Sequence, residues 1–371
     1  MIAKFKIHVD KPLALLTGAL IVAGAMIFAS AAFGQLARGA SMSSVFFSHL
    51  VLGLGLGGAV MLVLTFIDYR VWRKYAPYLF ALSLLVTAAV FIPQIGFTHG
   101  GGTRWLHIFG ISFQPSEALK LGSIFAAAAY FSMARHKIHT FMHGLGGLFA
   151  VLAVPIVLLI LQPDLGTLSI ICIAVGSIFF AAGASWRDLL LVVLVGFACL
   201  AILATLRPYV LDRIETFLNP AHGQQGQSYQ IKQSLIAVGS GGLVGRGFGQ
   251  GIQKFTYLPE PMGDSIYAVA AEELGFVGAV GIVCLFLAYG LRGYAVAARA
   301  PDLFGALLAV GICTYLIAEA FINIAAMLGL APLTGVPLTF MSQGGSAMLI
   351  SLASAGILLS ISRSRARTSL V

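Results

Sequence analysis

The sequence predicts an all-α integral membrane protein with ten transmembrane helices and a long extracytoplasmic loop between the seventh and eighth helices. Of its 371 residues, 59% are hydrophobic and 9% are charged, against about 25% charged residues in soluble domains. Apolar runs recur at roughly the 20-residue length that crosses a bilayer. The longest polar stretch, 207–263, is too short to hold a sizeable core alone. Residues 1–371 are therefore expected to form a single polytopic domain.

Ten apolar runs are long enough to be membrane spans. They lie near 13–33, 46–67, 77–95, 115–134, 144–161, 166–183, 188–206, 264–291, 303–328 and 344–362. The first run follows a basic flank, but its length favours a membrane anchor over a cleaved signal peptide.

The basic residues indicate how the spans are oriented. With the N-terminus inside, 14 of the 22 Lys and Arg residues fall in cytoplasmic segments, while the short external loops hold only Arg38 and Arg104. Since positive residues in short loops favour the cytoplasmic side, both termini are expected there. This topology accounts for the net charge of +9 without nucleic acid as a partner. All four cysteines lie within apolar runs, where they are expected to pack inertly.

The segment "QPSEALK" (114–120) opens the fourth run. Pro115 suits the first turn of a helix, and a carboxylate at Glu117 is favoured there by the helix dipole. Lys120 follows three residues later and so shares a face with Glu117. A buried acid–base pair facing a cavity is the favoured interpretation. A dipole role for Glu117, and snorkelling of Lys120 to the surface, are the alternatives.

Two aspartates stand at helix entrances on the external side. Asp164, in "QPDLGT", is either an N-cap or a substrate contact. Asp264 stands at the external mouth of the eighth run, above a line of small residues at 268, 271, 275 and 278, and could also be an N-cap. An ionisable group near the membrane is a functional candidate by default. Glu272 and Glu273 are expected to make interhelical hydrogen bonds.

The 207–263 loop contains two local patterns. Ile231, Leu235 and Val238 recur at helical spacing, which predicts a short helix lying on the membrane. Seven glycines follow between 239 and 251. This stretch lacks the nucleotide-binding pattern G-x-x-x-x-G-K-[ST], so flexibility is the favoured role, with diphosphate contact through backbone N–H groups as the alternative.

Six ordered segments together resemble the SEDS family of shape, elongation, division and sporulation proteins, over nearly the whole chain. They are "RWL" (104–106), "QPSEALK" (114–120), "QPDLGT" (162–167), "YQIKQSLIAVGSGGLVGRG" (229–247), "YLPEPMGDSIYAVAAEELGFVG" (257–278) and "TGVPLTFMSQGGS" (334–346). "QKFTYLPEP" (253–261) resembles the FtsW and SpoVE branches more than RodA. Here "MGD" and "SQGGS" stand where the family often has His-Thr-Asp and Ser-Tyr-Gly-Gly-Ser.

The resemblance implies a peptidoglycan glycosyltransferase that polymerises lipid II into glycan strands at the outer face of the bacterial cytoplasmic membrane, for cell division or cell-wall elongation. It implies a class B penicillin-binding protein as transpeptidase partner, together with membrane proteins of the division or elongation complex. On this basis Asp264 is the candidate general base, and Glu117 and Lys120 are the other catalytic candidates. Candidates for substrate contact are Arg104, Trp105, Asp164, Arg213, Gln230, Glu260 and Ser342.

The diphosphate leaving group calls for positive charge. Arg104, Lys120 and Arg213 are candidates to supply it, with a divalent cation, Mg²⁺ or Mn²⁺, as a further candidate. No other cofactor is expected.

Two other classes of function remain open. A lipid II flippase or another transporter would need polar residues inside the bundle, near the midplane and on both sides of it. In this chain the informative charges gather on one face. A non-catalytic scaffold of the division machinery would leave Glu117, Lys120 and Asp264 without a role.

Overall fold

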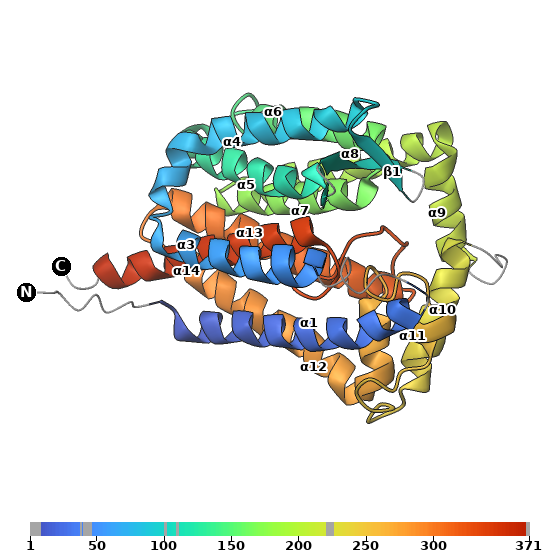
Figure 1. The fold of residues 1–371 in the computed structure, drawn as a ribbon. Coiled ribbons are helices and arrows are strands. Elements are labelled where there is room, and N and C mark those ends of the chain that lie inside the picture. The colour runs from blue at the N-terminus through green and yellow to red at the C-terminus, as the bar shows by residue number, and fades with distance from the viewer. Residues whose placement is uncertain are drawn as a thin grey trace, which may run out of the picture.

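The computed structural model describes residues 9–37, 39, 47–99, 102–108, 111–219 and 226–368, and it is mostly helical (Figure 1). Its helices are α1 (Lys11–Ala37), η1 (Phe47–Leu56), α3 (Gly57–Phe66), α4 (Arg70–Ala88), η2 (Ala89–Phe91), α5 (Pro115–Ala134), η3 (Arg135–Lys137), α6 (Leu145–Leu161), α7 (Leu165–Ala181), α8 (Trp186–Leu206), α9 (Pro208–Leu218), α10 (Gln227–Ser240), α11 (Gln253–Thr256), α12 (Ile266–Ala297), α13 (Leu303–Met327) and α14 (Gly345–Thr368). Three strands, β1 (Gly96–His99), β2 (Gly102–Ile108) and β3 (Ile111–Phe113), complete the described fold.

Several of these helices have the length and composition of membrane spans. Within the described residues, seven are long and apolar enough to cross a membrane, and two more apolar helices, α6 and α7, have 17 residues each. Helix α5 has 20 residues and carries Glu117 and Lys120. Every run expected from the sequence overlaps a helix, which confirms a multi-pass helical membrane protein.

Helix α13 forms the centre of the bundle. It packs against α5, α7, α12 and α14, and large side chains such as Tyr315 are fully buried there. Helix α8 is the opposite case, because none of its residues is buried. After Arg187 and Asp188 in its first turn the helix is almost wholly apolar, and such a helix without a buried face fits a lipid environment better than water.

The start of α1 and the end of α14 lie at the same end of the bundle (Figure 1). There the backbone N–H of Asp10 donates to Oγ of Ser362 at 3.2 Å, and the Asp10 carboxylate binds Arg292 through bonds of 2.8 and 2.6 Å. These contacts fasten α1 to α12 and α14.

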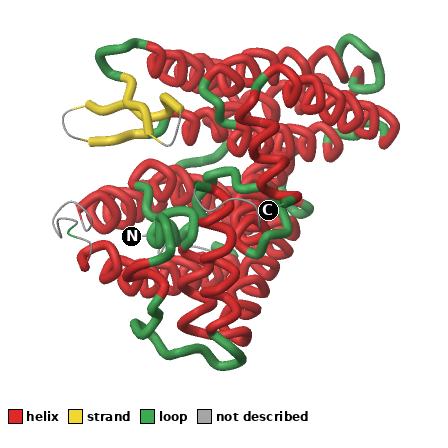
Figure 2. Tube along the Cα trace, turned by 90° about the vertical axis from the view of Figure 1, so that its right-hand side faces the viewer, coloured by secondary structure: helices red, strands yellow, loops and turns green. Residues whose placement is uncertain are grey.

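The opposite end of the bundle carries a small β-sheet and helix α9, neither of which was predicted from the sequence. Strands β1, β2 and β3 form an antiparallel sheet in that order, and Figure 2 shows it beside the helix ends. The 207–263 segment contains helix α9 as well as the predicted helix, which is α10. Ile231 of α10 is buried, and α10 packs on α12 and α13.

The glycine-rich segment is packed rather than loose, which corrects the flexible role expected from its composition. A Cβ atom on Gly245 would lie 2.1 Å from the carbonyl oxygen of Glu273, and one on Gly241 would lie 2.2 Å from that of Ala271. Helix α12 is itself interrupted at Gly275, whose φ is +67°. The glycines therefore allow two backbones to touch, at a position where only glycine adopts the required φ without strain.

Candidate active site

Asp264 lies in the loop that leads into α12. Its side chain does not cap the helix, because the N-cap is Ser265 and that end has no side-chain cap hydrogen bond. This contradicts the N-cap alternative. Among the described residues no group donates a hydrogen bond to the Asp264 carboxylate. A Cβ atom on Gly335 would lie 3.6 Å from Oδ2 of Asp264 and 4.0 Å from Nη1 of Arg104. The acid and the guanidinium thus border the same space.

A cleft of about 360 Å³ opens beside this pair. Its lining includes Arg104 from β2, Pro163 before α7, and a row of α9 and α10 side chains: Tyr209, Asp212, Arg213, Thr216 and Gln227. Asp264 stands next to the cleft rather than in its lining, and Arg104 borders both. The hydroxyl of Tyr209 is buried without a hydrogen-bond partner in the described structure. The cleft therefore offers two cationic groups and an unused hydroxyl.

Backbone carbonyls fix the guanidinium of Arg104. Its Nε donates to the carbonyl of Gln162 at 3.2 Å, and its Nη2 donates to the carbonyl of Pro163. Neither bond neutralises the positive charge, so Arg104 remains available to an anion in the cleft.

The electrostatics of the site favour a proton acceptor that works near neutral pH. Burial and the charge of Glu260 raise the pKa of Asp264 to about 7, while the positive charges of Arg104 and Arg213 oppose this rise. Burial, followed by the charge of Arg104, lowers the pKa of Arg213. A carboxylate with a pKa near the working pH is suited to general base catalysis.

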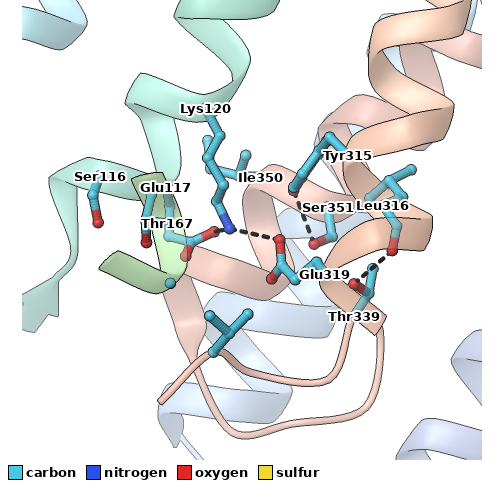
Figure 3. Close-up of polar contacts among 12 residues, drawn as sticks. Ser116, Glu117, Lys120, Thr167, Tyr315, Leu316, Glu319, Thr339, Ile350 and Ser351 are labelled. Carbon is cyan, nitrogen blue, oxygen red and sulfur yellow. Dashed lines mark hydrogen bonds and ion pairs between the residues drawn. The ribbon is translucent and has the colours of Figure 1, made fainter. Parts of the chain in front are cut away.

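Lys120 lies in a closed ionic cluster rather than in the cleft. Its Nζ lies 2.8 Å from Oε2 of Glu117 and 2.6 Å from Oε2 of Glu319, and all three side chains are at most 1% exposed. Figure 3 shows the ammonium between the two carboxylates, with Tyr315 nearby. The predicted Glu117–Lys120 pair is present and neither member snorkels. However, the expected access of Lys120 to the cleft is wrong, because the ammonium is enclosed.

The other candidate residues have individual structural roles. Asp164 caps α7, accepting from the backbone N–H and the hydroxyl of Thr167 at 3.2 and 2.9 Å. Ser342 donates to the carbonyl of Gly263 at 2.8 Å. Nε2 of Gln230 donates to Oγ of Ser265 at 3.0 Å. The last two contacts hold the residues on either side of Asp264, at the carbonyl of Gly263 and at the hydroxyl of Ser265.

Trp105 and Glu260 remain outside the cleft lining. Trp105 follows Arg104 on β2, and neighbouring side chains of a strand point to opposite faces, so Trp105 is directed away from the face that carries Arg104. Glu260 is exposed, with a φ of +42°, and acts on Asp264 through its charge.

Glu272 and Glu273 hold the glycine segment against α12. Glu272 accepts from the backbone N–H of Ile252 at 2.8 Å. Glu273 accepts from Gly249 at 2.9 Å, from Ser30 of α1 at 2.6 Å, and from Nζ of Lys254 at 2.5 Å. The contact with α1 is the expected interhelical bond, while the bonds to the glycine segment were not predicted.

The sequence places this arrangement in a known family. Residues 11–367 match the family model described as cell cycle protein, which groups FtsW, RodA and SpoVE. The chain belongs to this family.

Relatives in the FtsW/RodA/SpoVE family cover most of the chain. Stage V sporulation protein E of Bacillus subtilis (strain 168) is 37% identical over 86% of this chain and 88% of its own length. A probable peptidoglycan glycosyltransferase FtsW of Geobacter sp. (strain M18) is 40% identical over 80% and 81%. One of Coxiella burnetii is 35% identical over 95% of both chains.

Solved structures of the family share the fold. A chain from a structure described as a peptidoglycan synthase complex that coordinates polymerization and crosslinking matches with a TM-score of 0.77 and 29% identity, covering 97% of this chain and 99% of that chain. The crystal structure of the Thermus thermophilus rod shape determining protein RodA matches with a TM-score of 0.71 and 28% identity, covering 97% and 98%.

The described side chains of this family member form no ready-made site for a divalent cation. No group of three or more His, Cys, Asp or Glu residues in the described ranges could hold a metal ion. The cleft instead presents Arg104 and Arg213, which repel a cation. No catalytic step is therefore assigned to Mg²⁺ or Mn²⁺.

Two residues were missed at the sequence level. Glu319 completes the ionic cluster with Lys120, and its signal was visible as an acid inside an apolar run. Tyr209 lies in α9, which was interpreted as part of the 207–263 loop because its 11 residues are too few to span a membrane.

Proposed function

We propose that this chain is a peptidoglycan glycosyltransferase that joins lipid II units into glycan strands. One observation carries the proposal: in a member of this family, a carboxylate free of hydrogen-bond donors within the described structure lies beside an arginine-lined cleft. A polymerase needs a proton acceptor for the incoming sugar and positive charge for the departing diphosphate. Asp264 and the two arginines supply these functions from one end of the bundle.

Asp264 is the general base in this proposal. Its carboxylate removes the proton from the 4-hydroxyl of the acceptor sugar as that oxygen attacks the anomeric carbon of the donor. The bond from the anomeric carbon to the diphosphate oxygen breaks, and the single displacement inverts the configuration. A group in this role contributes about 10²–10⁴ to the rate.

Arg104 and Arg213 bind the diphosphate of the donor. A guanidinium presents a planar set of N–H donors that matches phosphate oxygens, and the carbonyls of Gln162 and Pro163 hold Arg104 in place. The free hydroxyl of Tyr209 is a further donor in the same cleft. Glu117 and Lys120 act indirectly, by holding α5 against α13 through Glu319.

The proposed topology has ten membrane spans in one domain, with both termini in the cytoplasm and the 207–263 segment outside. The enclosed charges lie toward the end of the bundle that carries the cleft, which favours a polymerase over a transporter. The proposed setting is the bacterial cytoplasmic membrane, where the chain works with a class B penicillin-binding protein and with other proteins of the division or elongation complex.

The test is polymerisation of lipid II by the purified full-length chain, alone and with a class B penicillin-binding protein from the same genome. We expect glycan strands in at least one of the two conditions. Translocation of a fluorescent lipid II across vesicles, with no glycan product in either condition, would contradict the proposal in favour of a flippase.

A further inference from the structure

Three successive backbone carbonyls in front of α12 are held by one neighbouring region. The carbonyl of Met262 accepts from the backbone N–H of Gln343 at 2.6 Å, that of Gly263 accepts from Oγ of Ser342 at 2.8 Å, and that of Asp264 accepts from Nδ2 of Asn323 at 2.9 Å. The donors belong to α13 and to the segment between α13 and α14. The backbone of Asp264 is therefore fixed from one side, while its carboxylate remains free.

Asn323 is the most constrained of these donors. Its side chain is 2% exposed, and its amide nitrogen also donates to the carbonyl of Val336 at 2.7 Å. An amide group has two N–H donors, and here both are used. They join the Asp264 loop to the segment that carries Gly335, the glycine that borders both the Asp264 carboxylate and Arg104.

Helix α13 gives this amide a rigid support. Glu319 lies four residues before Asn323 and so on the same face. Its carboxylate binds Lys120, as Figure 3 shows, and this contact anchors that face to α5. One helix face thus carries both the ionic cluster and the amide that holds the Asp264 backbone.

We propose that Asn323 is a positioning residue for the general base, fixing the backbone of Asp264 so that its carboxylate stays directed at the space shared with Arg104. The inference rests on the proposed function of Asp264. Asn323 does not itself touch the substrate in this account. A displacement of about 1 Å in a catalytic group can cost about 10²-fold in rate, so loss of the amide acts on turnover more than on substrate binding.

The test uses the purified full-length chain and lipid II, with kcat, KM and melting temperature measured for each variant. Asn323→Leu keeps a similar volume and removes both donors. Thr339→Val is the matched control, because it deletes a buried hydrogen bond of 3.1 Å from the same segment to the carbonyl of Leu316, away from Asp264. Asp264→Asn is the reference for loss of the base.

We expect Asn323→Leu to lower kcat by about 10- to 100-fold with KM changed by less than about threefold, and to shift the pH midpoint of the remaining activity. We expect Thr339→Val to keep kcat within about twofold of the wild-type value, even if its melting temperature falls as much as that of Asn323→Leu. Wild-type kcat in Asn323→Leu beside an inactive Asp264→Asn overturns the positioning role alone. An equal loss of kcat in Asn323→Leu and Thr339→Val also overturns the positioning role. Normal polymerisation by Asp264→Asn overturns the proposed function and the positioning role with it.

If Asn323→Leu does not fold, Asn323→Ala takes its place, since it also removes both donors to the carbonyls of Asp264 and Val336. A fall in kcat at constant KM supports the proposal. Wild-type kcat in that variant overturns it.

Discussion

At the scale of single residues, the proposed role of Asp264 as general base rests on how few contacts its carboxylate makes. Five acids in the neighbouring helices and loops are engaged: Asp164 by Thr167, Glu272 and Glu273 by the glycine segment, and Glu117 and Glu319 by Lys120. Among the described residues, Asp264 is the acid that has both an unpaired carboxylate and a pKa raised to about 7. A base must be deprotonated to work, so the raised pKa has a direct kinetic consequence.

We expect kcat/KM for lipid II polymerisation to rise about tenfold per pH unit below pH 7 and to level off above it, because this ratio reports the pKa of the free enzyme. Glu260→Gln should move the midpoint to lower pH, since the charge of Glu260 raises the pKa of Asp264. The measurement is a pH–rate profile of both proteins in the same detergent. A wild-type midpoint near pH 4, or a midpoint unchanged in Glu260→Gln, would show that Asp264 is not the titrating base.

At the scale of elements, the break in α12 depends on Gly275. A Cβ atom there would lie 2.2 Å from the backbone nitrogen of Gly245 and would have to adopt a φ of +67°. Gly275→Ala should therefore destabilise the protein by about 1–3 kcal/mol, the usual cost of such backbone strain, and more if the two backbones separate. Gly281→Ala, in the same helix with open space around it, should leave stability unchanged or raise it slightly. Equal melting temperatures for the two variants would rule out the close approach.

The ionic cluster between α5 and α13 makes a second prediction at this scale. Lys120→Met leaves two buried carboxylates facing each other, and breaking a buried pair in this way costs about 3–5 kcal/mol. Adding Glu117→Gln and Glu319→Gln removes the uncompensated charge, so the triple variant should regain at least half of the lost stability. Thermal unfolding of the single and triple variants in the same detergent is the measurement. A single variant that melts normally but does not polymerise lipid II would instead place Lys120 at the substrate.

The sequence predicted the elements whose signal is local and missed those that depend on partners. Apolar runs of membrane length predicted the long apolar helices, and helical spacing predicted α10. The sheet of β1, β2 and β3 was missed because its strands of four, seven and three residues carry little alternation. The glycine segment was interpreted as flexible because its packing partner, the backbone around Gly275, is distant in sequence. Glu319 was missed for a similar reason: its pairing with Lys120 joins helices 199 positions apart.

At the scale of the whole molecule, the helix-fastening contacts of Asp10 and the proposed active site lie at opposite ends of the bundle. At one end the start of α1 is fastened to α12 and α14 through Asp10. At the other end lie the sheet, α9 and α10 (Figure 1), and residues of β2, α9 and α10 line the cleft together with Pro163. Family membership predicted this division of roles, because its motifs lie in the loops of one face. Sequence alone did not separate the residues that line the cleft from those that hold it, since Asp164 and Ser342 lie in family motifs just as the candidate catalytic residues do.

The most direct test of the account is the lipid II polymerisation rate of purified Asp264→Asn protein, with the melting temperature measured at pH 8 on the same preparation. Asp212→Asn, which removes another carboxylate from the edge of the same cleft, is the control. Because the folded-state pKa of Asp264 is raised, ionising it costs stability between about pH 4 and pH 7, and Asp264→Asn should melt no lower than wild type at pH 8. We expect its rate to fall by about 10²–10⁴, against less than about threefold for Asp212→Asn. A wild-type rate in Asp264→Asn protein that is fully folded would contradict the account.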